Sequence, residues 1–172
     1  WNETAAVEVA DLPQSVFPRT RRSTNLHREI MGVSEMSDRK PRIAVIGTGG
    51  TISSVGRNSL DIVRYGENNK IYEVDELLNA FPETLEQADV VPVRLRAIPS
   101  TALGPADWLD INAKIHELAQ ADPSLAGVVV THGTSTLEET VYFLNLTVKA
   151  DLPVVLVGAQ RPASGLSTDA GM

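Results

Sequence analysis

Short apolar runs alternate with amphipathic stretches along most of the chain. Four runs predict strands, at 42–46, 90–98, 127–130 and 153–157. Three stretches with apolar residues at helical spacing predict helices, over 74–81, from 105 onward and from 137 onward. Strands that alternate with helices form βαβ units, and strands apolar on both faces are typical of a buried parallel sheet. We therefore expect an α/β fold, with an open, mostly parallel sheet and helices on both faces (Rossmann-like, three layers), incomplete at its carboxyl end.

Local signals predict where the helices begin and end. Pro82 stops the first helix, and Pro105 lies in the first turn of the second. Thr136 and Glu139 have the spacing of a capping box, in which each side chain accepts a hydrogen bond from the other's backbone N–H. The sequence at 167–169 resembles the cap of a further helix.

Two segments lie outside the predicted sheet and helices. Residues 1–41 are polar, carry a basic group at 19–22 and show no sustained period, so we expect a disordered or cloning-derived leader. We then expect residues 42–172 to form the α/β domain, truncated before a second domain. Residues 55–70 are rich in Gly, Asn and Ser, and a long loop over a site is usually a lid or disordered.

Composition excludes several classes of function. The 172 residues are 42% hydrophobic and 22% charged, as in one globular domain, and no apolar run is long enough to span a membrane. A net charge of −7 argues against nucleic acid and acidic membranes as partners. The chain has no cysteine and only three scattered histidines, His27, His116 and His132, so we expect no metal. No signal peptide is evident, and we expect a cytoplasmic protein. His116 lies off its helix's apolar stripe and should face solvent.

Small and polar residues follow the first strand, in the sequence Gly-Thr-Gly-Gly-Thr at 47–51. Similar breaks follow the other strands, and ligands bind at the carboxyl edge of a parallel sheet. Three interpretations of the first break are open: a tight turn, a phosphate-binding loop, or a site in which Thr51 is a nucleophile. The spacing fits neither a dinucleotide fingerprint nor a P-loop, and a threonine nucleophile needs a neighbouring base or proton relay.

Two long motifs resemble the signatures of the bacterial-type L-asparaginases. The stretch 45–53 is similar to the first signature throughout, and 127–137 resembles the second, which contains His-Gly-Thr-Asp-Thr. The resemblance continues through 138–140 and 157–162. It implies a hydrolase that converts asparagine, and often glutamine, to the acid and ammonia without metal or cofactor.

The resemblance also implies roles for individual residues. Thr51 would attack the side-chain amide carbon, Tyr65 on the lid would assist proton transfer, and Thr134 would be a second catalytic threonine. Ser100 would hold the substrate's α-carboxylate, and His132 would be structural. The full substrate-binding set implied is Ser100, Thr101, Ser135, Gly50, Gly133 and Ala159. The partners implied are a small-molecule amide and, in the full-length protein, further copies of the chain in a tetramer.

The sequence departs from the family pattern at two of these positions. Ser135 stands where the motif has aspartate, which pairs with the substrate's α-ammonium, and Thr101 stands where glutamine is expected. In the family a carboxy-terminal domain completes the site. We expect this chain to stop before that domain, so that residues 1–172 alone would be inactive and poorly folded. A related amidase with an altered substrate remains an alternative. So does a binding module without catalysis, either a nucleotide binder or an inert relative.

Overall fold

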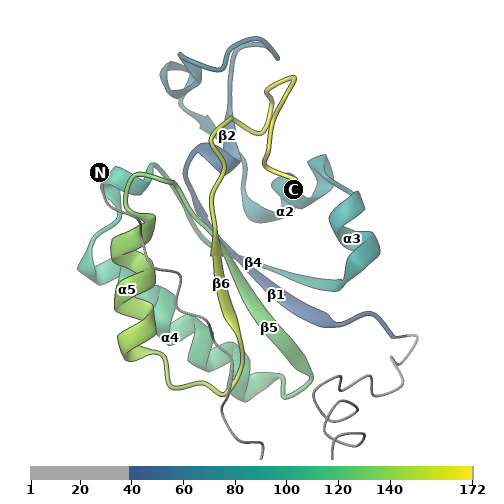
Figure 1. Cartoon of the computed structure of the whole chain (residues 1–172), viewed down its shortest axis with the longest axis vertical. Coiled ribbons are helices and arrows are strands. Elements are labelled where there is room, and N and C mark those ends of the chain that lie inside the picture. The colour runs from purple at the N-terminus through teal and green to yellow at the C-terminus, as the bar shows by residue number, and fades with distance from the viewer. Residues whose placement is uncertain (1–38, 172) are drawn as a thin grey trace, which may run out of the picture. The chain divides into compact units, whose positions relative to one another are not determined.

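A parallel β-sheet organises the part of the chain that the computed structural model describes, residues 39–171 (Figure 1). Its four described strands lie in the order β4-β1-β5-β6, with every neighbouring pair parallel. Their bounds are β1 Arg42–Gly49, β4 Asp89–Ile98, β5 Leu125–Thr131 and β6 Val154–Val157. The predicted parallel α/β sheet is thus confirmed. The predicted leader lies outside the described residues, except for 39–41.

One face of the sheet carries the main hydrophobic core. Helices α4 (Pro105–Ala121) and α5 (Leu137–Thr147) cover this face. Ala44 and Ile46 of the central strand are fully buried against Ile111 and Ile115 of α4. Side chains alternate between the two faces of a strand, so residues two apart on β1 share this core.

The opposite face is covered by α2 (Val74–Ala80) and α3 (Glu83–Gln87). The first of these helices packs directly on β1, because a methyl group at Gly47 would lie 2.7 Å from Val74 Cβ. Arg94 on β4 holds α2 through two contacts of 2.6 Å to Asp75. Helices therefore lie on both faces, as predicted.

Several local predictions need correction. The capping box at the start of α5 is wrong, because Thr136 makes no side-chain cap bond and its hydroxyl donates instead to the carbonyl of Ser100, at 2.9 Å. His116 does not simply face solvent: it is half-buried, contacts the carbonyl of Asn112 and accepts the backbone N–H of Lys149. Helix α3 follows Pro82 and was not predicted.

Three further segments differ from expectation. Strand β6 was predicted to be buried, but it lies at an edge of the described sheet and its Val155 is 50% exposed. The predicted lid is not simply a loop, since it carries the 3-10 turn η2 (Tyr65–Asn68) and joins two short antiparallel strands. These strands are β2 (Ser54–Val55) and β3 (Lys70–Ile71). The cap expected at 167–169 is also different, because Asp169 accepts the backbone N–H groups of Gln160 and Arg161.

Within residues 39–171, none of the helices has the length and apolar character that crossing a membrane requires. The same residues contain no group of three or more His, Cys, Asp or Glu side chains arranged to hold a metal ion.

Candidate active site

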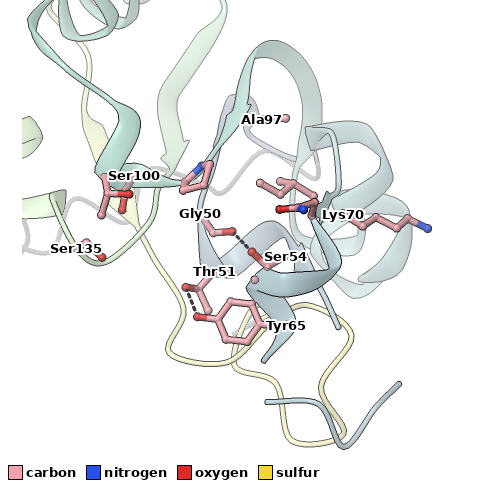
Figure 2. A pocket seen from close by; sticks show the side chains of 13 residues that line it. Gly50, Thr51, Ser54, Tyr65, Lys70, Ala97, Ser100 and Ser135 are labelled. Atoms are coloured by element: carbon pink, nitrogen blue, oxygen red, sulfur yellow. Dashed lines mark hydrogen bonds between the residues drawn. The ribbon is translucent and has the colours of Figure 1, made fainter. Parts of the chain in front are cut away.

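A cavity of about 390 Å³ opens where the strands β1, β4 and β5 end (Figure 2). Its walls come from the turn after β1, the turn after β4, the loop after β5 and the lid. The lining residues are Gly50, Thr51, Ser54, Tyr65, Gly66, Asn69, Lys70, Ile71, Ala97, Pro99, Ser100, Thr101 and Ser135. Residues from four separate segments therefore meet at the carboxyl edge of the sheet, where parallel sheets bind ligands.

The turn after β1 requires glycine at two successive positions. Gly49 and Gly50 both have positive φ, +96° and +82°, a region that other residues rarely adopt. A methyl group at Gly49 would lie 2.4 Å from the carbonyl oxygen of Ile98, and one at Gly50 would lie 2.2 Å from Gly133 Cα. The backbone N–H of Gly50 donates to that same Ile98 carbonyl, at 3.0 Å. This turn brings the next residue, Thr51, to the cavity wall.

Thr51 begins the 3-10 turn η1 (Thr51–Ser53), and its hydroxyl meets the hydroxyl of Tyr65 at 2.9 Å (Figure 2). Either hydroxyl can donate in this pair. Ser54 stabilises the turn, because its hydroxyl donates to the carbonyl of Gly50 at 2.9 Å. The arrangement places a hydroxyl that can act as a nucleophile next to a hydroxyl that can carry a proton.

The lid that carries Tyr65 is fastened at both ends of its loop. Asn68 donates from its side chain to the carbonyl of Val55, at 2.8 Å. On the outside, the hydroxyl of Ser164 accepts the backbone N–H of Gly56 at 2.8 Å, and the carbonyl of Ser59 accepts the N–H of Leu166 at 2.8 Å. The segment around Ser164 therefore holds the lid in the position that brings Tyr65 to Thr51.

The turns after β4 and β5 pack against each other beside the cavity. Ser100 lies in the 3-10 turn η3 (Ser100–Ala102) and is 5% exposed. It packs on Gly133, because a methyl group at Gly133 would lie 2.5 Å from the Oγ of Ser100. The hydroxyl of Thr136 donates to the Ser100 carbonyl and ties the two turns together. Ser135 is exposed and lies near Ser100 at the cavity wall (Figure 2).

Six of the nine predicted site residues line this cavity: Gly50, Thr51, Tyr65, Ser100, Thr101 and Ser135. Ala159 does not, because it is 1% exposed and packs in a hydrophobic cluster with Ile52, Leu77 and Ala163. Gly133 is buried between Gly50 and Ser100, and the exposed Thr134 is not among the lining residues.

Several lining residues were missed by the sequence analysis. Ser54 follows directly after the first motif, and the position of a hydroxyl there could have suggested a role in the turn. Asn69 and Lys70 lie on the lid, and no motif marks them.

The lining of the cavity is almost uncharged. It contains one cation, Lys70, and no carboxylate from the described residues. The Lys70 ammonium lies 5.7 Å from the centre of the Tyr72 ring, and Figure 2 shows its side chain extending away from Thr51. A ligand in this cavity would thus meet hydroxyl groups and backbone from the described chain, but no anionic group.

Comparison with known proteins gives a consistent family. Residues 42–172 match the family model described as "Asparaginase, N-terminal". The chain is 36% identical over 130 residues to a glutaminase-asparaginase of Acinetobacter glutaminasificans, covering 76% of this chain and 38% of the relative. It is 37% identical over 156 residues to L-asparaginase 2 of Bacillus subtilis, covering 88% of this chain and 41% of the relative.

A solved structure is similar as well. The crystal structure of a probable cytoplasmic L-asparaginase from Campylobacter jejuni aligns with a TM-score of 0.68 and 40% sequence identity. The alignment covers 77% of this chain and 39% of that protein. The chain thus spans well under half the length of the relatives that it matches. It belongs to the asparaginase family and matches the amino-terminal domain of that family over residues 42–172.

Proposed function

We propose that the full-length protein is an amidohydrolase that converts L-asparagine to L-aspartate and ammonia, with Thr51 as the nucleophile. The observation that carries the proposal is the contact of 2.9 Å between the hydroxyls of Thr51 and Tyr65 in a cavity at the sheet edge. Membership of the asparaginase family supports the reaction class. The names of the relatives, L-asparaginase and glutaminase-asparaginase, support the substrate class.

The proposed reaction has two steps that balance. In the first, Thr51 Oγ1 bonds to the side-chain amide carbon of asparagine, its proton passes by way of Tyr65 to the amide nitrogen, and ammonia leaves. In the second, water attacks the resulting ester, aspartate is released, and the threonine hydroxyl is restored. A covalent intermediate of this kind divides one difficult step into two easier ones. The tetramer expected from the resemblance also remains a proposal, which sedimentation of the full-length protein would test.

A second candidate is hydrolysis of a related amide that lacks a free α-amino group. Serine occupies position 135, where the family motif has aspartate, and no carboxylate of the described chain lines the cavity. An α-ammonium group that is partly removed from water needs an anionic or well-placed acceptor. The described residues offer only neutral acceptors there, which favours a substrate without that charge, unless an acid from outside them completes the site.

The test is ammonia release from L-asparagine by the full-length protein and by two variants at one position. Thr51→Ala removes the hydroxyl, and we expect activity to fall by at least about 10³-fold, as for other catalytic nucleophiles. Thr51→Ser is the matched control, because it keeps a hydroxyl and should keep measurable turnover. Near-normal ammonia release by Thr51→Ala would show that another group is the nucleophile.

A further inference from the structure

His132 is a buried side chain that the proposed reaction does not use. It follows β5 directly, is 0% exposed and comes just before the loop that carries Thr134 and Ser135. Its backbone N–H donates to the carbonyl of Val157 at 2.7 Å, which fixes its position at the end of the sheet. A fully buried imidazole is usually held by hydrogen bonds at both ring nitrogens.

The partners of the ring decide where its proton lies. Nδ1 is 2.7 Å from the carbonyl oxygen of Gly133, which can only accept, so Nδ1 must carry a proton. Nε2 is 3.0 Å from the hydroxyl of Thr140, which can donate or accept. In a neutral ring Nε2 is then an acceptor, and the single hydroxyl proton of Thr140 points at it. The other acceptor within reach of this hydroxyl is the carbonyl of Thr136, at 3.1 Å, which also accepts the backbone N–H of Thr140.

A cationic ring would also satisfy these contacts, with the Thr140 hydroxyl turned toward Thr136. Burial argues against the cation, because it lowers the pKa of His132 from its ordinary value of 6.5. The carbonyl of Gly133 and the charge of Glu139 act in the opposite direction on the pKa of His132, but less strongly. The neutral ring with its proton on Nδ1 is therefore the form that fits both the contacts and the burial.

The hydrogen bond to Gly133 sets the direction of one peptide plane. Every described peptide bond is trans, so the Gly133 carbonyl and the Thr134 N–H lie in one plane and point in opposite directions. The ring draws the carbonyl inward and thereby directs the N–H away from His132. Gly133 packs closely against Ser100 and Gly50, two residues that line the cavity, because a methyl group at Gly133 would lie 2.5 Å from Ser100 Oγ and 3.1 Å from Gly50 Cα. A rotation of this peptide would therefore displace the loop that carries Thr134 and Ser135.

We propose that His132, held by Thr140 as the neutral Nδ1–H tautomer, is a positioning residue that orients the Gly133–Thr134 peptide for catalysis. The inference rests on the proposed function for its effect on turnover, but the tautomer does not depend on that function. His116 provides a matched control. Its Nδ1 also lies near a carbonyl, that of Asn112, and its Nε2 accepts the backbone N–H of Lys149, yet it lies on α4 and lines no part of the cavity.

The first experiment is NMR of the wild-type full-length protein labelled with ¹⁵N-histidine, near pH 8. The ring signals of His132 are assigned by their loss in His132→Asn. We expect a protonated Nδ1 and an unprotonated Nε2. A protonated Nε2, alone or together with Nδ1, would overturn the proposal without any measurement of activity.

The second experiment compares kcat and KM for His132→Asn and His132→Gln. The side-chain amide of asparagine can place an N–H where Nδ1 was and donate to Gly133, whereas that of glutamine reaches the Nε2 position instead. We expect His132→Asn to keep kcat within about threefold, and His132→Gln to lose about 10²-fold in kcat with little change in KM, as for small misplacements of catalytic groups.

A merely structural role predicts a different result, with both variants less stable but kcat per folded site unchanged. That result, or an equal loss of kcat in both variants, would overturn the proposal. His116→Gln should leave kcat unchanged, and a comparable loss there would also count against a specific role for His132. If the wild type releases no ammonia from L-asparagine, the proposed function fails. The NMR measurement of the His132 tautomer still tests this inference in that case.

Discussion

Ser135 is the position where one substitution should change substrate preference most clearly. Its side chain lines a cavity that has no carboxylate among the described residues, and it lies near Ser100 at the cavity wall (Figure 2). Ser135→Asp would place a negative charge where the family motif has one. The α-ammonium of asparagine would then meet an ionised acceptor in place of a neutral hydroxyl.

The size of the effect follows from the two kinds of hydrogen bond. A hydrogen bond to a charged group contributes about 1.5–3 kcal/mol, and a neutral one about 0.5–1.5 kcal/mol. The difference is about 1–1.5 kcal/mol, or roughly five- to tenfold in binding. Ser135 is exposed, so water screens the attraction between the carboxylate and the ammonium. The lower end of this range therefore applies. We therefore expect about a fivefold lower KM for L-asparagine in Ser135→Asp.

The assay compares kcat/KM for L-asparagine and for succinamic acid, which lacks the α-amino group. Ser135→Asp should improve the ratio in favour of asparagine, because only asparagine carries the ammonium. Ser135→Asn is the matched control, since it has the shape of aspartate without its charge and should leave the ratio nearly unchanged. The reasoning is refuted if the wild type already prefers asparagine strongly and Ser135→Asp brings no gain.

Three further changes test the turn, the buried histidine and the lid. Gly49→Ala should lower the free energy of unfolding by about 2–4 kcal/mol in a urea titration, because of its φ of +96° and the carbonyl 2.4 Å from the added methyl, whereas Gly104→Ala, with open space around it, should cost far less. Because the folded state holds the pKa of His132 below 6.5, the unfolded chain binds the extra proton. Stability should therefore fall as pH drops below 6.5, by up to about 1.4 kcal/mol per pH unit, and His132→Asn should lack this slope. Ser164→Ala removes the acceptor of the Gly56 N–H and should raise KM about fivefold through a looser lid, whereas an unchanged KM would show that this bond does not hold the lid.

The spacing of apolar residues and the positions of the glycines were sufficient to predict the scaffold of the site. The four strands and the turn at 47–51 depend on local preferences, namely β-branched apolar runs and positive φ at Gly49 and Gly50. The identity of the hydroxyl opposite Thr51 did not follow from the pattern. Tyr65 lies 14 residues further along the chain, and only the family resemblance marked it.

Contacts between segments far apart in the sequence could not be predicted from the sequence pattern or from the family resemblance. Thr136 has the right spacing for a cap, but the turn after β4 passes close by, and the Thr136 hydroxyl donates its hydrogen bond to the Ser100 carbonyl instead. Ser164 contacts Gly56 across 108 residues, a separation at which the sequence carries no local signal. Ala159 follows a strand of the sheet, as Thr51 and Ser100 do, yet it packs in a hydrophobic cluster with Leu77 of α2.

The central claim is that Thr51 forms a covalent bond to the substrate. Its most direct test is rapid acid quenching of the full-length protein during turnover of L-asparagine, followed by peptide mapping by mass spectrometry. We expect an aspartyl ester on Thr51 in the wild type and no ester in Thr51→Ala. An ester found on a different residue, or full turnover by Thr51→Ala, would contradict the assignment.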